Sequence, residues 1–345
     1  MNISEIFHQL EKEYPQRLPG SAGAAATAEI VKNQIAALGF TAETQKISVY
    51  SLQTSIWGYV LGSLLSMVMA YFSPIVGLIM AGLFWLLLLK EPFRPTLAKI
   101  RPGRAENIHL NIPARSKESQ KIVFLTGLVT DNFAEHPFKQ HSRFFISLVW
   151  LCGLAFYLML IFSAYHRSVL FTLLTLIPIL IIVILNIPIK EAPASGVLSN
   201  CSLLLEVSAI LAKAGVNTTS ITFCFTGTNS LNSGIDGLPK RLKGNPELKY
   251  VVNLVDWADK RINLVTTDGL LFPLQTDPFL VESFMEVARE KGVPVQTIKL
   301  SEVSASYSLK LRKLKAISVT NPLDSAESNK NLRELIIGFI RKLDN

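Results

Sequence analysis

The chain has 345 residues, of which 49% are hydrophobic and 17% are charged, and its formal net charge is +8. Many of the excess lysine and arginine residues lie next to long uncharged stretches of the sequence. Anionic lipid headgroups are therefore the expected partner, and nucleic acid is not. The three cysteines, Cys152, Cys201 and Cys224, have neither paired nor metal-type spacing, so no disulfide framework and no cysteine zinc site is expected.

Three stretches carry no charged residue: 56–89, 144–165 and 168–189. A bilayer core of about 30 Å needs about 20 apolar residues per helix, and buried helices of soluble proteins seldom run so long without a charge. Ser73-Pro74 divides the first stretch into two helices, and His166-Arg167 leaves space for only a tight turn between the other two stretches. The sequence therefore predicts an integral membrane protein with four spans, arranged as hairpins 56–89 and 144–189.

The remaining segments, 1–55, 90–143 and 190–345, lie on one side of the membrane in this interpretation, because an even number of crossings returns the chain to its starting side. Cations flank the spans on that side, whereas Arg167 stands alone in the hairpin tips. By the positive-inside rule, we expect the soluble domain and both termini in the cytoplasm.

Small residues recur in the first hairpin at intervals of four. Such spacing allows two helix backbones to approach closely, here within the hairpin rather than between two chains. The residues are Gly58, Gly62, Ser66 and Ala70, followed by Gly77 and Ala81 in the second helix.

Helical and strand patterns alternate outside these stretches. In residues 23–38, for example, Ala28, Val31 and Ile35 share one helical face, and Gly39 follows as a helix terminator. The expected helices are 23–38, 197–214, 279–290 and a last helix through 332–343, and the expected strands are 42–50, 107–112, 121–128, 221–225, 250–254 and 316–319. This alternation predicts one α/β domain with a mostly parallel mixed sheet that helices cover on both faces.

Several short motifs follow one another along the chain and cover nearly all of it outside the apolar stretches. They are Arg17-Leu-Pro-Gly-Ser21, Leu38-Gly39-Phe40 and segments 107–113, 122–125, 199–206, 223–229, 251–254 and 320–325. In this order they resemble the di-zinc exopeptidases of the bacterial leucyl aminopeptidase type, with transmembrane hairpins inserted. The resemblance implies a zinc-exopeptidase fold, in which His and carboxylate side chains hold two zinc ions and a Glu acts as general base.

The positions that match the family's ligands and general base are occupied by other residues here, so the chain looks like a degenerate member. The resulting vestigial pocket consists of Leu128, Thr130, Asp131, Ser199, Asn200, Thr228, Asn229, Val255 and Thr320. A set of neutral side chains cannot supply the negative charge that offsets the dehydration of two divalent cations. We therefore expect no catalytic residue, no metal and no cofactor, and a pseudo-enzyme that binds or scaffolds at the membrane.

Several alternatives stay open. Asp131, His136, His141 and Asp256 could form a rearranged site in a membrane-bound metallo-aminopeptidase, in which case zinc would be the cofactor. Glu135 lies in the same loop, but the spacing matches no zinc motif. A transporter is disfavoured because the apolar stretches carry no ionisable group. The expected partners are the lipid bilayer and a peptide, a lipid headgroup or a membrane protein.

Overall fold

A computed structural model describes residues 3–14, 17, 21–49, 52–90, 103–128, 142–166, 174–185, 197–227, 248–257, 261–269, 273–300, 305–322 and 326–344. The chain divides into two compact units. The first comprises Met1–Val49, Arg104–Asn132 and Pro193–Asn345, and the second comprises Tyr50–Gly103 and Phe133–Ala192. We call the first the α/β unit and the second the helical unit.

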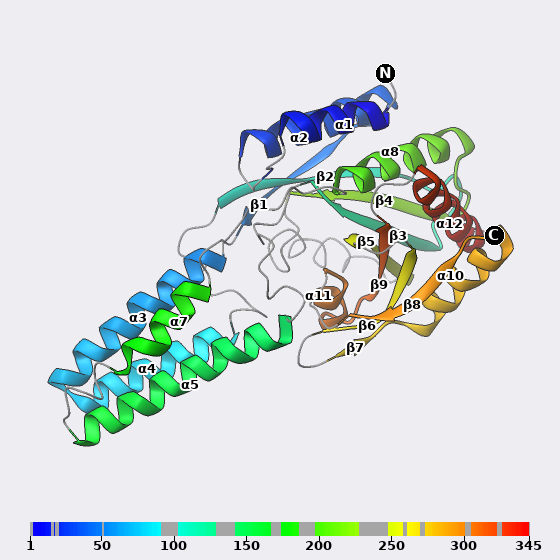
Figure 1. The fold of residues 1–345 in the computed structure, drawn as a ribbon. Helices are drawn as coiled ribbons and strands as arrows, with labels where there is room; N and C mark the ends of the chain where they lie inside the picture. Colours follow the sequence, from blue (N-terminus) through cyan, green and yellow to red (C-terminus); the bar gives the residue numbers. More distant parts are fainter. Residues whose placement is uncertain are drawn as a thin grey trace. The chain divides into compact units, whose positions relative to one another are not determined.

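The α/β unit contains a mixed sheet in the order β1-β2-β4-β3-β5-β9-β6-β7, with β8 paired to β6 (Figure 1). Its centre is parallel, because β4, β3, β5 and β9 all run in the same direction. β2 and β6 pair antiparallel on the two sides of this centre. The strands are β1 (Glu43–Val49), β2 (Gly103–Ile112), β3 (Gln120–Gly127), β4 (Thr219–Thr226), β5 (Leu248–Trp257), β6 (Ile262–Asp268), β7 (Leu274–Gln275), β8 (Val295–Lys299) and β9 (Lys315–Pro322).

Alternating side chains of the central strands enter two different cores. Ile122 and Phe124 of β3 belong to the large core, whereas Val123 and Leu125 belong to a small one on the opposite face. All four side chains are buried, which explains why β3 is a continuous apolar run in the sequence. The mixed, helix-flanked sheet that the sequence predicts is therefore confirmed.

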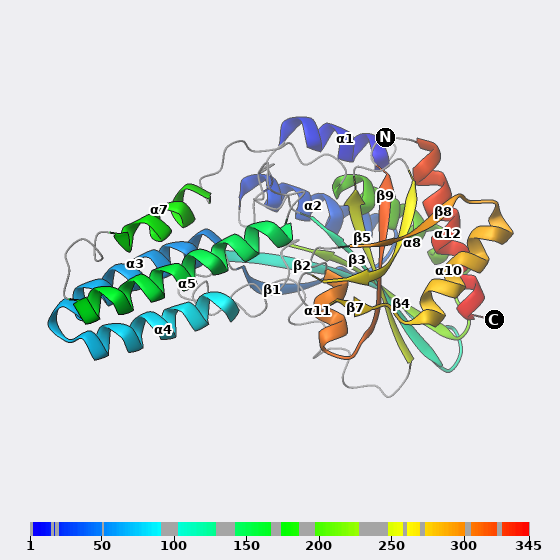
Figure 2. The ribbon, with the colours of Figure 1, turned by 60° about the horizontal axis from the view of Figure 1, so that its bottom comes forward.

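The helices cover the two faces of the sheet unequally (Figures 1 and 2). The large core lies beneath α2 (Ala22–Ala37), α8 (Val197–Ala214), α10 (Pro278–Lys291), α12 (Ala326–Asp344) and α1 (Ile3–Glu13). The small core lies beneath the short helix α11 (Ala305–Leu311). Residues next to the helix ends fix two boundaries: Ser21 Oγ accepts from Ala24 N at 3.2 Å before α2, and Gly292 adopts a left-handed φ of 65° after α10.

The central elements occur where the sequence predicts them, and the differences at their ends are a few residues. Five elements were not predicted: α1, β6, β7, β8 and α11. β7 has 2 residues and α11 has 7, too few for a period to be visible in the sequence.

The helical unit contains α3 (Leu52–Phe72), α4 (Pro74–Lys90), α5 (Ser142–His166) and α7 (Leu176–Leu185). The expected close packing in the first hairpin is present. A Cβ on Gly62 would overlap the Phe84 ring, and a Cβ on Gly77 would overlap the backbone of Ala70. Glycine at both positions therefore lets α3 and α4 approach each other.

The prediction of an integral protein with four spans is wrong. In the described ranges, no helix combines the length and the apolarity that crossing a membrane requires. The absence of charge records how apolar a segment is and does not fix where a helix begins and ends. The prediction of cytoplasmic termini, which depended on these spans, is withdrawn with them.

Candidate functional site

The candidate site lies at the edge of the sheet where the parallel strands β3, β4, β5 and β9 end. Parallel strands bring their carboxyl ends to the same edge, where ligands of open α/β sheets bind. The described residues of the vestigial pocket are Leu128, Ser199, Asn200, Val255 and Thr320, and each lies at the end of one of these strands or in the first turn of α8.

Val255 and Thr320 are brought together directly. They are register partners in the parallel ladder between β5 and β9, so their side chains share one face of the sheet. Thr320 is completely buried, and its Oγ1 accepts hydrogen bonds of 3.1 Å from both the backbone N and the Nδ2 of Asn263 on β6. The hydroxyl that stands where the family has its last histidine is thus held within the sheet.

Leu128 and the start of α8 meet on the other face. Leu128 is part of the large core, and its backbone N donates to Thr226 O at 2.8 Å. Cys201 in the first turns of α8 donates from Sγ to Gly127 O at 3.1 Å. Ser199 donates from Oγ to Asn329 Oδ1 of α12 at 3.1 Å, and Asn200 is buried. The structure therefore places α8 against the end of β3.

Other predicted site residues lie outside the described part of the chain. They are Thr130, Asp131, Thr228 and Asn229 of the vestigial pocket and Glu135, His136 and His141 of the alternative site. Asp256 lies in β5, but its side chain is not among those described. These predictions remain predictions.

A buried polar network that the sequence did not reveal continues from β5 and β9 on the face covered by α11. Asn253 Nδ2 donates to Ser318 Oγ at 3.2 Å, and Ser318 Oγ donates to Ser306 Oγ at 2.9 Å. Ser306 Oγ then donates to Asp268 Oδ2 at 2.5 Å. Asn253 and Ser318 each lie two residues before a vestigial position, so the network adjoins Val255 and Thr320.

An ion pair ends this network. Lys310 Nζ lies 2.7 Å from Asp268 Oδ1 and donates to Thr276 Oγ1 at 2.8 Å. The Asp268 side chain is 0% exposed and that of Lys310 is 7% exposed. Burial lowers the pKa of Lys310 from its ordinary value, although the Asp268 carboxylate acts in the opposite direction. The one available sequence signal was the spacing of Ser306 and Lys310, four residues apart on one helical face.

The donor set does not fit a pair of zinc ions. Zinc in proteins is held by thiolate, imidazole or carboxylate, whereas the described pocket positions carry two aliphatic side chains, two hydroxyls and one carboxamide. The hydroxyls of Ser199 and Thr320 are already hydrogen-bonded within the protein. Across the described ranges, no group of three His, Cys, Asp or Glu side chains could hold a metal ion.

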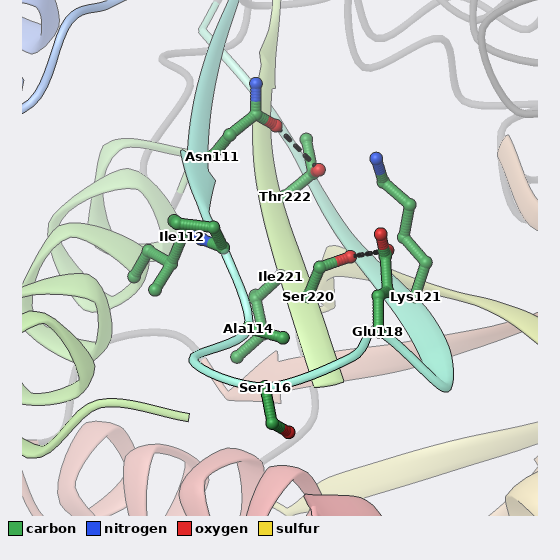
Figure 3. A pocket seen from close by; sticks show the side chains of 10 residues that line it. Asn111, Ile112, Ala114, Ser116, Glu118, Lys121, Ser220, Ile221 and Thr222 are labelled. Atoms are coloured by element: carbon green, nitrogen blue, oxygen red, sulfur yellow. Dashed lines mark hydrogen bonds between the residues drawn. The ribbon is translucent and has the colours of Figure 1, made fainter. Parts of the chain in front are cut away.

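A separate hollow lies at the opposite edge of the sheet (Figure 3). Its volume is about 370 Å³, and its lining comes from the end of β2 and the starts of β3 and β4. Ile112 and Ile221 are buried beside it, Thr222 donates to Asn111 Oδ1 at 2.7 Å, and Ser220 is hydrogen-bonded to Glu118. Because it adjoins the opposite ends of β3 and β4, it is separate from the candidate site.

Solved structures with a similar fold agree with this architecture. Glutaminyl cyclase from an Acidobacteriales bacterium matches with a TM-score of 0.56 at 13% identity, over 99% of this chain and 93% of that one. The fold is that of the zinc exopeptidases. Two aminopeptidases match with a TM-score of 0.53: Legionella pneumophila LapA, at 11% identity over 99% of this chain and 71% of that one, and the zinc aminopeptidase BSAP of Bacillus subtilis, at 9% identity over 99% and 95%.

The similarity to solved zinc-exopeptidase folds is found by comparing structures and not by comparing whole sequences. No protein-family model matches the chain, and no curated protein matches it. The motif resemblance described above is therefore confirmed at the level of the fold, and the activity of this chain is a separate question.

Proposed function

We propose that the α/β unit is a zinc-exopeptidase fold that works without metal, as a binding or scaffolding module and not as a hydrolase. The observation that carries the proposal is the donor set: Leu128, Ser199, Val255 and Thr320 stand at ligand positions and provide no charge and no imidazole. Such a site does not lower the pKa of a water molecule, which in the metallo-hydrolases is the function of the ion.

The packing around positions 128 and 320 also supports the proposal that metal binding has been lost. Restoring a histidine at position 320 would place an imidazole where a buried threonine hydroxyl holds Asn263. A histidine at 128 would place a polar ring in the large core. Both changes would require the neighbouring elements to repack. The proposed ligand of the module is a peptide, a lipid headgroup or a membrane protein partner.

Metal analysis tests the proposal. The full chain, purified without chelators and then supplied with zinc, is analysed by plasma mass spectrometry and assayed with an aminopeptidase substrate and with a glutaminyl peptide. We expect much less than one zinc per chain and no chelator-sensitive turnover. About two zinc ions per chain with chelator-sensitive hydrolysis would refute the proposal.

The competing proposal is a membrane-bound metallo-aminopeptidase with a site rearranged around Asp131, His136, His141 and Asp256. It predicts that zinc is retained and that His136→Ala and His141→Ala each release it. The matched control is His8→Ala, because His8 is an exposed histidine of α1, remote in sequence from that loop. Zinc that survives all three substitutions would contradict the rearranged site as well.

A further inference from the structure

The helical unit has an inverted distribution of polarity. Every large hydrophobic side chain that the described residues expose belongs to this unit, except Phe279 and Leu311. Examples are Leu61 at 64% exposed, Ile75 at 71% and Leu151 at 62%. A folded monomer rarely exposes contiguous apolar surface on this scale without a partner.

The interior of the same unit contains hydroxyl groups. Ser63, Ser66 and Thr175 are completely buried. Ser66 Oγ donates to Gly62 O at 2.7 Å, and Thr175 Oγ1 donates to Met67 Sδ at 3.2 Å. A unit that keeps hydroxyls inside and leucines outside is arranged for apolar surroundings, where a hydroxyl needs a partner within the protein.

The exposed apolar side chains surround the unit. α3 contacts α4, α4 contacts α5, α5 contacts α7 and α7 contacts α3, so the four helices form a closed ring (Figures 1 and 2). Each helix has its own apolar stripe on the outside, represented by Val68 on α3, Ile79 on α4, Leu158 on α5 and Leu180 on α7. One protein partner would cover one side of such a ring, whereas a fluid apolar phase covers every side.

We propose that the outer surface of the helical unit contacts the hydrocarbon of a lipid bilayer. Charge supports a lipid surface as the occupant. The four helices carry charged residues only at Lys90, Arg143 and, when protonated, His166, and cations such as Arg94 and Lys99 follow α4 in the sequence. Cations beside an apolar segment complement anionic headgroups.

Exposed aromatic residues lie at two of the helix ends. Tyr71 and Phe72 at the end of α3 are 88% and 76% exposed, and Tyr165 at the end of α5 is 82% exposed. Aromatic side chains of this kind are enriched where lipid meets water. Contact with lipid requires no helix to cross the bilayer.

Vesicle flotation tests the proposal. The full chain, diluted out of detergent, is mixed with phosphatidylcholine vesicles with or without phosphatidylserine and centrifuged through a density gradient. We expect the chain to float with both and to remain bound in high salt. Ile75→Asp combined with Ile79→Asp should lower the bound fraction at least about tenfold, because aspartate is costly in hydrocarbon. The control is Leu311→Asp, which alters a side chain of the α/β unit that is 51% exposed and should float like the parent chain.

A second measurement reports contact directly. The three native cysteines are buried, so an environment-sensitive dye can be attached selectively at Ile79→Cys or, as control, at Leu311→Cys. Vesicles with brominated acyl chains should quench the dye at position 79 and leave the dye at position 311 unchanged. Two results would overturn the proposal: a chain that stays unbound and unquenched beside vesicles, or a detergent-free homodimer by light scattering that buries position 79 and ignores lipid. Neither result bears on zinc content, so the proposed function is tested separately.

Discussion

The buried ion pair between Asp268 and Lys310 gives the sharpest stability prediction. Lys310→Met keeps most of the aliphatic stem and removes the ammonium group that lies 2.7 Å from the completely buried Asp268 carboxylate. Removing one partner of a buried pair costs about 3–5 kcal/mol because the other charge is left uncompensated.

A control variant isolates the effect of the unpaired carboxylate. A double variant, Asp268→Asn with Lys310→Met, carries neither charge and should recover part of the stability.

Urea unfolding of the two variants and the parent chain, followed by circular dichroism and checked by hydrogen exchange of β6 and α11, measures these differences. The order of stability that we expect is parent, double variant, Lys310→Met. A decrease in the free energy of unfolding below about 1 kcal/mol for Lys310→Met, the magnitude typical of an exposed pair, would refute the view that Lys310 compensates a buried carboxylate.

Three further outcomes are expected. Burial lowers the pKa of Lys310 in the folded chain below 10.5, so the unfolded chain keeps this proton to a higher pH. In urea titrations, the stability of the parent relative to Lys310→Met should therefore rise as the pH increases towards 10.5. A fall in this relative stability would mean that the Asp268 carboxylate has the larger effect on the Lys310 pKa. Asp344→Ala removes a carboxylate that accepts from the backbone N of Asn217, Thr218 and Thr219 at 2.7 to 2.9 Å, and should lower the free energy of unfolding by about 2–3 kcal/mol, with Asp344→Asn less severe. Gly77→Ala should destabilise the helical unit by about 1–3 kcal/mol in thermal melts. The control is Gly82→Ala, which should be tolerated because its Cβ would lie 3.5 Å from Tyr157. Equal effects of the two substitutions would contradict the close packing of α3 and α4.

The sequence alone determined the centre of the fold. Strands β3, β4 and β5 could be predicted because they are buried on both faces and therefore appear as continuous apolar runs. Order along the chain then indicated the family's fold, which the solved structures share. The residues of the vestigial pocket are also given by the sequence, and the shortage of charge that they imply stays a prediction.

Only the tertiary structure decided which polar groups are paired. Asp268, Ser306 and Lys310 lie on elements too short or too irregular to be predicted, and their carboxylate, hydroxyl and ammonium groups meet because α11 packs against β9 and β7, the two strands that flank β6 in the sheet. The helix bounds were decided at the same level: α5, for example, extends from Ser142 to His166, beyond the charge-free stretch 144–165. Composition measures how apolar a segment is, but the backbone determines where each helix ends, and the contacts between elements determine which side chains are buried.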